Sequence, residues 1–137
     1  MKTEGIHRVV VVVKDLENAV KRWSELLRMD FIDFGVQEGY GVRAMVSLDW
    51  SVELIQPTDP KSYAGRFLER AGEGVIGVAF MTDDLEKAKA NAVERGFRLI
   101  GEADFGSVDI WKSYREIMLH GNETNGAPVV LVQAELK

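Results

Sequence analysis

The segment RVVVVVKDLENA, residues 8–19, is repeated in pattern by GVAFMTDDLEKA, residues 77–88. Each copy is an apolar run followed by an acidic residue and then by apolar residues at helical spacing. The apolar runs are too short for buried helices and rich in bulky side chains, so each predicts a β-strand. Asp15 and Asp84 stand where a carboxylate can accept from the free amides of a helix's first turn, so we expect both to be N-caps. The repeat therefore predicts two strand–helix units.

Each strand–helix unit is followed by three more strand-like runs, which are separated by glycines and other turn residues. After the first unit they are residues 31–36, 41–48 and 51–56. After the second unit they are less distinct and lie near residues 97–102, 114–120 and 128–133. Apolar residues at helical spacing, which end at Gly72, predict a short helix between the two halves.

These elements predict one α+β domain built from two βαβββ modules that form a curled mixed sheet around a shared cleft. Its parts are module one at residues 1–60, a linker helix within 61–73 and module two at 74–137. A chain of 137 residues suits one such domain. Because a cleft of this kind is a natural ligand site, we expect a small-molecule partner.

Composition narrows the classes of partner and site. The net charge of −5 argues against a nucleic-acid partner, which usually requires a basic surface. No apolar stretch is long enough for a membrane span, and the first residues lack the layout of a secretion signal, so a cytoplasmic protein is expected. The chain has no cysteine, so any metal site must use His, Asp or Glu.

Two longer segments resemble the vicinal oxygen chelate superfamily, which includes glyoxalases, bleomycin resistance proteins, dioxygenases and epimerases. The first segment, at residues 52–102, is most similar to the methylmalonyl-CoA epimerases and reads VELIQPTDPKSYAGRFLERAGEGVIGVAFMTDDLEKAKANAVERGFRLIGE. LHGNETNGAPVVLVQ, residues 119–133, resembles the final hairpin and strand of that family. The resemblance implies a glyoxalase-like fold and a homodimer.

The resemblance also implies a divalent-metal site with four ligands, one from the first and one from the last strand of each module. The matching positions in this chain are Arg8, Glu53, Gly77 and Val130. Arginine stays protonated, and glycine and valine carry no donor atom, so only Glu53 could bind a metal. Gly39 occupies the position of the family's catalytic glutamate. We therefore predict that the metal site is lost and that no cofactor is bound.

A rearranged divalent-metal site would need other donors. His7 neighbours the first ligand position, but adjacent strand residues point to opposite faces of a sheet. We therefore expect Arg8 to face the cleft and His7 to lie at the surface or in an interface. Glu38 precedes the lost catalytic position and is more typical of a solvated turn, and His120, near the final hairpin, is expected to be exposed.

Arg8 and Glu53 are the candidate catalytic residues and also candidate ligand-binding residues. They could form an ion pair that replaces the metal and spares Glu53 the cost of a lone charge. Alternatively, Arg8 receives a carboxylate, enolate or phenolate through its planar fork, and Glu53 acts as a general base. The two roles are compatible.

The remaining candidate ligand-binding residues are expected to line the cleft. They are Tyr40, Gly77, Trp111, Tyr114 and Val130. The three aromatic members are candidates for stacking on a flat ligand. Trp50 and Trp111 lie in turn-like segments, where large aromatic residues often mark a binding surface or a dimer contact.

Three functions are compatible with these residues. The first is a metal-independent protein that binds an anionic or carbonyl-bearing small molecule over Arg8 and Glu53. The second is an epimerase, isomerase or lyase on an acyl-CoA or small carboxylate, in which Arg8 stabilises an enolate. The third is a metal-dependent enzyme like methylmalonyl-CoA epimerase. The sequence leaves the choice between a binding protein and an enzyme open.

Overall fold

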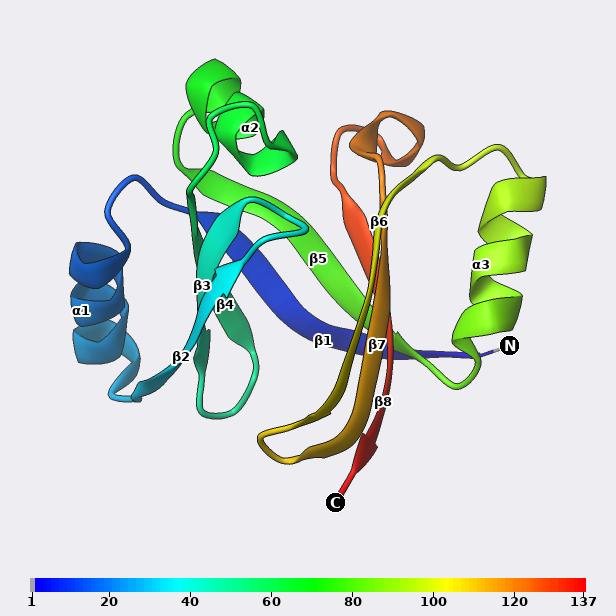
Figure 1. Ribbon diagram of the computed structural model, residues 1–137, viewed down its shortest axis with the longest axis horizontal. Coiled ribbons are helices and arrows are strands. Elements are labelled where there is room, and N and C mark those ends of the chain that lie inside the picture. Colours follow the sequence, from blue (N-terminus) through cyan, green and yellow to red (C-terminus); the bar gives the residue numbers. More distant parts are fainter. Residues whose placement is uncertain (1) are drawn as a thin grey trace. The chain divides into compact units, whose positions relative to one another are not determined.

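The computed structural model describes residues 2–137 (Figure 1). Its elements are β1 (Thr3–Val12), α1 (Leu16–Leu27), β2 (Phe31–Gln37), β3 (Val42–Ser47), β4 (Val52–Pro57), α2 (Tyr63–Ala71), β5 (Gly74–Thr82), α3 (Leu85–Glu94), β6 (Leu99–Val108), β7 (Trp111–Leu119), the 3-10 helix η1 (Gly121–Thr124) and β8 (Val129–Leu136). The predicted α+β fold with two βαβββ modules joined by a helix is confirmed. No helix within residues 2–137 is long and apolar enough to cross a membrane.

The chain forms two compact units whose boundaries lie inside strands β1 and β5. The first unit is Arg8–Ile76, and the second is Gly77–Lys137 together with residues 2–7. Each of the two strands therefore contributes one part to each unit. Arg8 and Gly77, the two first-strand positions singled out by the family resemblance, directly follow these boundaries.

The sheet of the first unit has the strand order β2-β3-β4-β1. Strands β2, β3 and β4 pair with their neighbours in antiparallel fashion, whereas β1 pairs with β4 in parallel. Val11 of β1 and Leu54 of β4 lie on one face and pack with Leu16 and Ala19 of α1. Because strand residues alternate between faces, the neighbours of Val11 and Leu54 point to the other side of the sheet.

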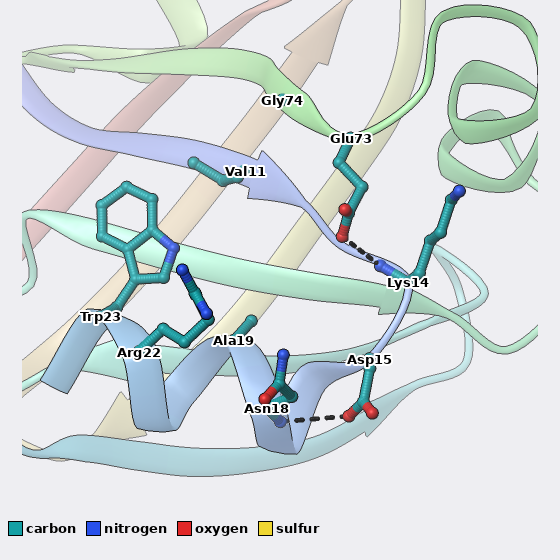
Figure 2. A pocket seen from close by; sticks show the side chains of 9 residues that line it. All are labelled: Val11, Lys14, Asp15, Asn18, Ala19, Arg22, Trp23, Glu73 and Gly74. Atoms are coloured by element: carbon teal, nitrogen blue, oxygen red, sulfur yellow. Dashed lines mark hydrogen bonds between the residues drawn. The ribbon is translucent and has the colours of Figure 1, made fainter. Parts of the chain in front are cut away.

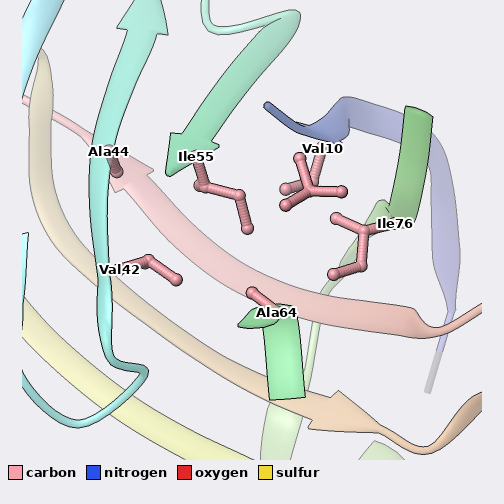
Figure 3. Packing of buried hydrophobic residues seen from close by; sticks show 7 residues of the cluster. Val10, Val42, Ala44, Ile55, Ala64 and Ile76 are labelled. Atoms are coloured by element: carbon pink, nitrogen blue, oxygen red, sulfur yellow. The ribbon is translucent and has the colours of Figure 1, made fainter. Parts of the chain in front are cut away.

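The face opposite α1 carries a cluster of buried apolar residues that packs against α2 (Figure 3). Its buried residues come from β1, β3, β4, α2 and the start of β5 and are Val10, Val12, Val42, Ala44, Ile55, Ala64 and Ile76. The partly buried side chains of Tyr40, Tyr63, Phe67 and Leu68 pack against this cluster. The arrangement gives the sheet two separate apolar cores, one on each face.

The first turn of α2 packs very closely against the loop before it. Ser62 caps the helix, and its hydroxyl oxygen accepts from the amide of Gly65 at 3.0 Å. A Cβ atom at Gly65 would lie 2.6 Å from the carbonyl oxygen of Asp59 and 2.7 Å from that of Pro60. Both are backbone atoms, so this position requires glycine.

The sheet of the second unit has the strand order β5-β8-β7-β6. Strands β5 and β8 are parallel, and β8, β7 and β6 are antiparallel neighbours. Leu85 and Ala92 of α3 pack on one face of this sheet against Ile117 and Leu119 of β7. This arrangement matches the helix-covered face of the first unit.

Both predicted helix caps are confirmed. The carboxylate of Asp15 accepts from the amide of Asn18 at 3.1 Å, and that of Asp84 accepts from the amide of Lys87 at 3.0 Å. The repeat between the two modules also extends into β2 and β6, beyond the two strand–helix segments in which the sequence showed it. Asp33-Phe34-Gly35 in β2 and Asp104-Phe105-Gly106 in β6 each coincide with a register shift, and each glycine has a positive φ.

Trp50 lies in the turn between β3 and β4, with a positive φ of 64° and only 5% of its surface exposed. Its ring packs against Phe34 of β2, with 5.3 Å between the ring centroids. The expectation that Trp50 marks a binding surface or dimer contact is therefore wrong, because its ring is packed inside the first unit.

Asp49 fixes the turn that carries Trp50. Its Oδ1 atom accepts from the hydroxyl of Ser51 at 2.6 Å, from the Ser51 amide at 3.0 Å and from the hydroxyl of Ser47 at 2.8 Å. These bonds, chiefly those from Ser51, hold the pKa of Asp49 below its ordinary value of 3.8.

We expect Asp49→Ala to lower the free energy of unfolding by about 1 kcal/mol near neutral pH. The folded-state pKa is lowered, so the contribution of the carboxylate is fully present above the unfolded-state pKa and is lost as the pH falls through the folded-state value. Urea denaturation at about pH 6 and about pH 3 should therefore show the difference from the wild type shrinking in acid. Asp30→Ala, at a nearby exposed aspartate, is the control. A loss in Asp49→Ala that is the same at both pH values would contradict this account.

Candidate functional site

The side chains of Arg8 and Glu53 form an ion pair within the first unit. The Nε atom of Arg8 donates to Oε1 of Glu53 at 2.8 Å. Only 5% of the Arg8 side chain and 16% of the Glu53 side chain are exposed. The structure thus brings together the two residues predicted to be catalytic. The two side chains meet laterally, because β1 and β4 are adjacent parallel strands of one sheet.

Strand register explains why these two side chains meet. Glu53 pairs with Val10 on β1 and with Val46 on β3, so the three side chains lie in one row on one face of the sheet. Arg8 is two residues before Val10 and therefore points to the same face. Val10 and Val46 are both buried, which places the charged pair beside apolar surface.

Because the ion pair is largely buried, each of its two charges depends on the other for stabilisation. Removing two charges from water is costly, and the cost is offset only when the charges are paired with good hydrogen-bond geometry. The bond to Glu53 holds the planar guanidinium in one orientation. A guanidinium held in this way presents a permanent positive charge to an oxygen anion, and the carboxylate can accept a proton or a hydrogen bond.

The other two positions at which the resemblance implies metal ligands lie in the second unit and carry no donor atom. Val130 of β8 is buried and pairs with Ala79 of β5 and Met118 of β7. Gly77 is also buried, and a Cβ atom there would lie 3.4 Å from the carbonyl oxygen of Pro128. Among residues 2–137, no group of three or more His, Asp or Glu side chains is placed to hold a metal ion.

Trp111 and Tyr114 belong to an aromatic cluster of the second unit. The ring of His7 lies 5.7 Å from that of Trp111 and 5.9 Å from that of Tyr114, and Phe105 lies 5.8 Å from Tyr114. Trp111 is only 8% exposed, so the expectation that it marks a surface contact is wrong. His7 is half-buried against these rings and does not lie on the open surface. The structure therefore joins two of the predicted stacking residues.

Three other residues considered in the sequence analysis lie outside both the Arg8–Glu53 pair and the aromatic cluster. Tyr40 is half-buried in the turn before β3 and packs against the apolar core of the first unit, and Glu38 in the same turn is exposed as predicted. His120 is half-buried, and its Nδ1 atom accepts from the amide of Asn122 at 3.0 Å. The expectation of an exposed His120 is wrong, because this side chain caps η1.

Glu116 was missed by the sequence reasoning. It is buried on β7 and pairs with Val132 of β8, on the same side of the strand as Tyr114 and Met118. The signal was a charged residue in a strand segment whose alternate positions, Tyr114 and Met118, are large and apolar. A buried carboxylate among such neighbours is a candidate polar contact for a ligand.

Residues 7–110 match the model of the glyoxalase/bleomycin resistance protein/dioxygenase superfamily. The chain belongs to this superfamily. The predicted resemblance is confirmed, and the glyoxalase-like fold with it. No protein with curated function matches the sequence.

Solved structures of methylmalonyl-CoA epimerases resemble this superfamily member over nearly its whole length. One, in complex with methylmalonyl-CoA and NH4+, is 26% identical with a TM-score of 0.82 and covers 96% of this chain and 95% of its own. A variant from Streptomyces coelicolor, in complex with 2-nitronate-propionyl-CoA, is 24% identical with a TM-score of 0.81 and coverages of 96% and 98%. The enzyme from Mycobacterium tuberculosis is 22% identical with a TM-score of 0.79 and coverages of 96% and 88%. At such identities the last two establish the fold alone.

Proposed function

We propose that this superfamily member binds a small anionic or carbonyl-bearing molecule over Arg8 and Glu53, without a metal ion. The observation that carries the proposal is the buried ion pair of these residues, at positions where the resemblance implies two metal ligands. A guanidinium is a permanent cation with donors in a planar fork. It can therefore receive a carboxylate or enolate oxygen that a metal would otherwise polarise.

The donor set supports a site that works without a metal. Glu53 is the one former ligand position that still carries a donor, and its carboxylate is bonded to Arg8. Structural and catalytic zinc sites use at least three protein ligands, and calcium sites use more. A single carboxylate beside a guanidinium is a poor substitute for such a set.

The surroundings of the pair support a ligand with an apolar part. Val10 and Val46 flank Glu53, and the apolar face continues along β1, β3 and β4. A ligand lying along this face would exclude water from the pair. Because hydrogen bonds to charged groups strengthen when water is excluded, Arg8 would hold the anionic end firmly.

A second candidate function is an epimerase, isomerase or lyase on an acyl-CoA or small carboxylate. It is favoured by the neighbouring structures that hold methylmalonyl-CoA and 2-nitronate-propionyl-CoA. In such a reaction Glu53 would remove the proton next to a carbonyl, and Arg8 would stabilise the enolate oxygen. Deuterium incorporation into methylmalonyl-CoA in heavy water, lost in Glu53→Gln, would favour this enzyme over a binding protein.

A ligand screen tests the proposal. Thermal unfolding is followed in the presence of a chelator with methylmalonyl-CoA, other acyl-CoAs, aromatic acids and planar antibiotics. A ligand present at 100 times its dissociation constant should stabilise the wild type by about 2.7 kcal/mol. Arg8→Gln should lose this gain, whereas Arg43→Gln, which alters a surface arginine paired with Asp33, should keep it. Equal stabilisation of Arg8→Gln, or a gain seen only without the chelator, would contradict the proposal.

We further propose that the protein is a homodimer in the cytoplasm. The dimer is supported by the resemblance to the epimerase family, and the location by the cysteine-free composition, which is compatible with a reducing compartment. Light scattering coupled to gel filtration tests the dimer, because a monomeric mass at micromolar concentration would contradict it.

A further inference from the structure

A hollow lies in the first unit on the side of the sheet that carries α1 (Figure 2). Its volume is about 480 Å³, and its apolar lining includes Val11 of β1 with Ala19 and Trp23 of α1. Val11 points to the α1 side of β1, whereas Arg8 points to the opposite side. The hollow is therefore separate from the Arg8–Glu53 site.

The acidic residues of the hollow are already engaged by backbone amides. The carboxylate of Asp15 accepts from the amide of Asn18 at 3.1 Å, as the cap of α1. The carboxylate of Glu73 accepts from the amide of Lys14 at 2.9 Å. The two carboxylates therefore stabilise the N-terminus of α1 and the loop at Lys14 before it.

The hollow is also lined by two basic residues, Lys14 and Arg22. Within residues 2–137, neither the guanidinium of Arg22 nor the ammonium of Lys14 forms an ion pair. Arg22 and Trp23 lie at the same end of the hollow, away from Asp15 and Glu73 (Figure 2). An arginine with uncommitted donors therefore stands beside a half-buried indole ring.

We propose that this hollow binds a small aromatic carboxylate. The aromatic ring lies on Trp23, Val11 and Ala19, and the carboxylate is held by the guanidinium of Arg22. Arginine binds a carboxylate through two parallel hydrogen bonds, and an indole offers a large apolar face for a ring. The volume falls in the range of small-molecule sites. The proposal concerns a second site and does not depend on the function proposed for Arg8 and Glu53.

The test uses 2-naphthoate as the probe and the full chain labelled with ¹⁵N. The chain has three tryptophans, so the indole N–H signal of Trp23 can be assigned by Trp23→Phe and followed alone. We expect a saturable shift of this signal on titration with 2-naphthoate. Arg22→Gln should weaken the affinity about tenfold, because it removes a charge-assisted contact. Lys21→Gln, the matched control at the preceding exposed position of α1, should leave the affinity unchanged.

Two further measurements test whether binding requires the ligand's charge and whether it is independent of the Arg8–Glu53 site. The neutral analogue 2-naphthylmethanol should bind at least about tenfold more weakly than 2-naphthoate, because it lacks the charge. Glu53→Gln should leave the shift and the affinity at Trp23 unchanged, which keeps this test independent of the Arg8 site. The proposal would be overturned by a stationary Trp23 signal, by equal affinities of Arg22→Gln and Lys21→Gln, by equal binding of the neutral analogue or by loss of the shift in Glu53→Gln.

Discussion

Arg8→Met should lower the free energy of unfolding by about 3 kcal/mol at neutral pH, because it leaves the carboxylate of Glu53 without its bonded cation. Only 16% of the Glu53 side chain is exposed, so water cannot fully replace the lost partner. Arg43→Met is the matched control. Arg43 pairs with Asp33 at 2.7 Å on the surface, and exposed pairs of this kind contribute less than about 1 kcal/mol.

A double variant shows whether the cost comes from the stranded charge. Arg8→Met/Glu53→Leu should recover most of the stability lost in Arg8→Met, because apolar residues can replace a buried ion pair at little cost. The measurement is urea denaturation of the wild type, both single variants and the double variant. Equal losses in Arg8→Met and Arg43→Met, or purely additive losses in the double variant, would show that the pair is not the buried, coupled unit described above.

Gly65→Ala should have a comparably large effect and destabilise the fold by about 3 kcal/mol. The new Cβ atom would meet the carbonyl oxygens of Asp59 and Pro60 at 2.6 and 2.7 Å. These are main-chain atoms, so the loop and the first turn of α2 must move apart. Ala64, the neighbour of Gly65, is buried in the apolar core under α2, so this movement would loosen that core as well.

Gly39→Ala is the control for this substitution. A Cβ atom at Gly39 has no neighbour within 4 Å, and its φ is not in the left-handed region. Its replacement should therefore leave stability unchanged or raise it slightly, because alanine restricts the unfolded chain. If thermal unfolding gave equal midpoints for the two variants, the close packing of α2 on the preceding loop would be refuted.

Local patterns in the sequence predicted the elements well. The apolar runs before Asp15 and Asp84 are strands, and both aspartates cap the helices that follow. Short-range signals of this kind depend on a few neighbouring residues and so can be recognised in one sequence. The same holds for the linker helix, which ends at Gly72 with a positive φ.

Burial of the aromatic residues could not be predicted in the same way. Trp50 and Trp111 stand in or next to turns, which suggested exposure, but their rings pack on Phe34 of β2 and His7 of β1, which are distant in the sequence. Such contacts depend on strand order and register, and these are properties of the whole sheet. Glu116 escaped notice for the same reason, because its burial follows from the position of β7 between β6 and β8.

The pairing of Arg8 with Glu53 was predicted, but the geometry was not. Alternation along β1 and the family register placed both side chains on one face, and the structure confirms their contact. That they sit on adjacent parallel strands requires β1 to pair with β4, which no local pattern indicates. The ion pair is therefore a lateral contact within one sheet.

We propose that Arg8 and Glu53 bind an anionic or carbonyl-bearing ligand in place of a divalent metal. The most direct test is calorimetric titration of chelator-treated protein with Co²⁺, together with elemental analysis of the protein as purified. We expect far less than one divalent ion per chain after purification, and no saturable uptake that differs between wild type and Glu53→Gln. A stoichiometric ion that binds the wild type and is lost in Glu53→Gln would contradict it.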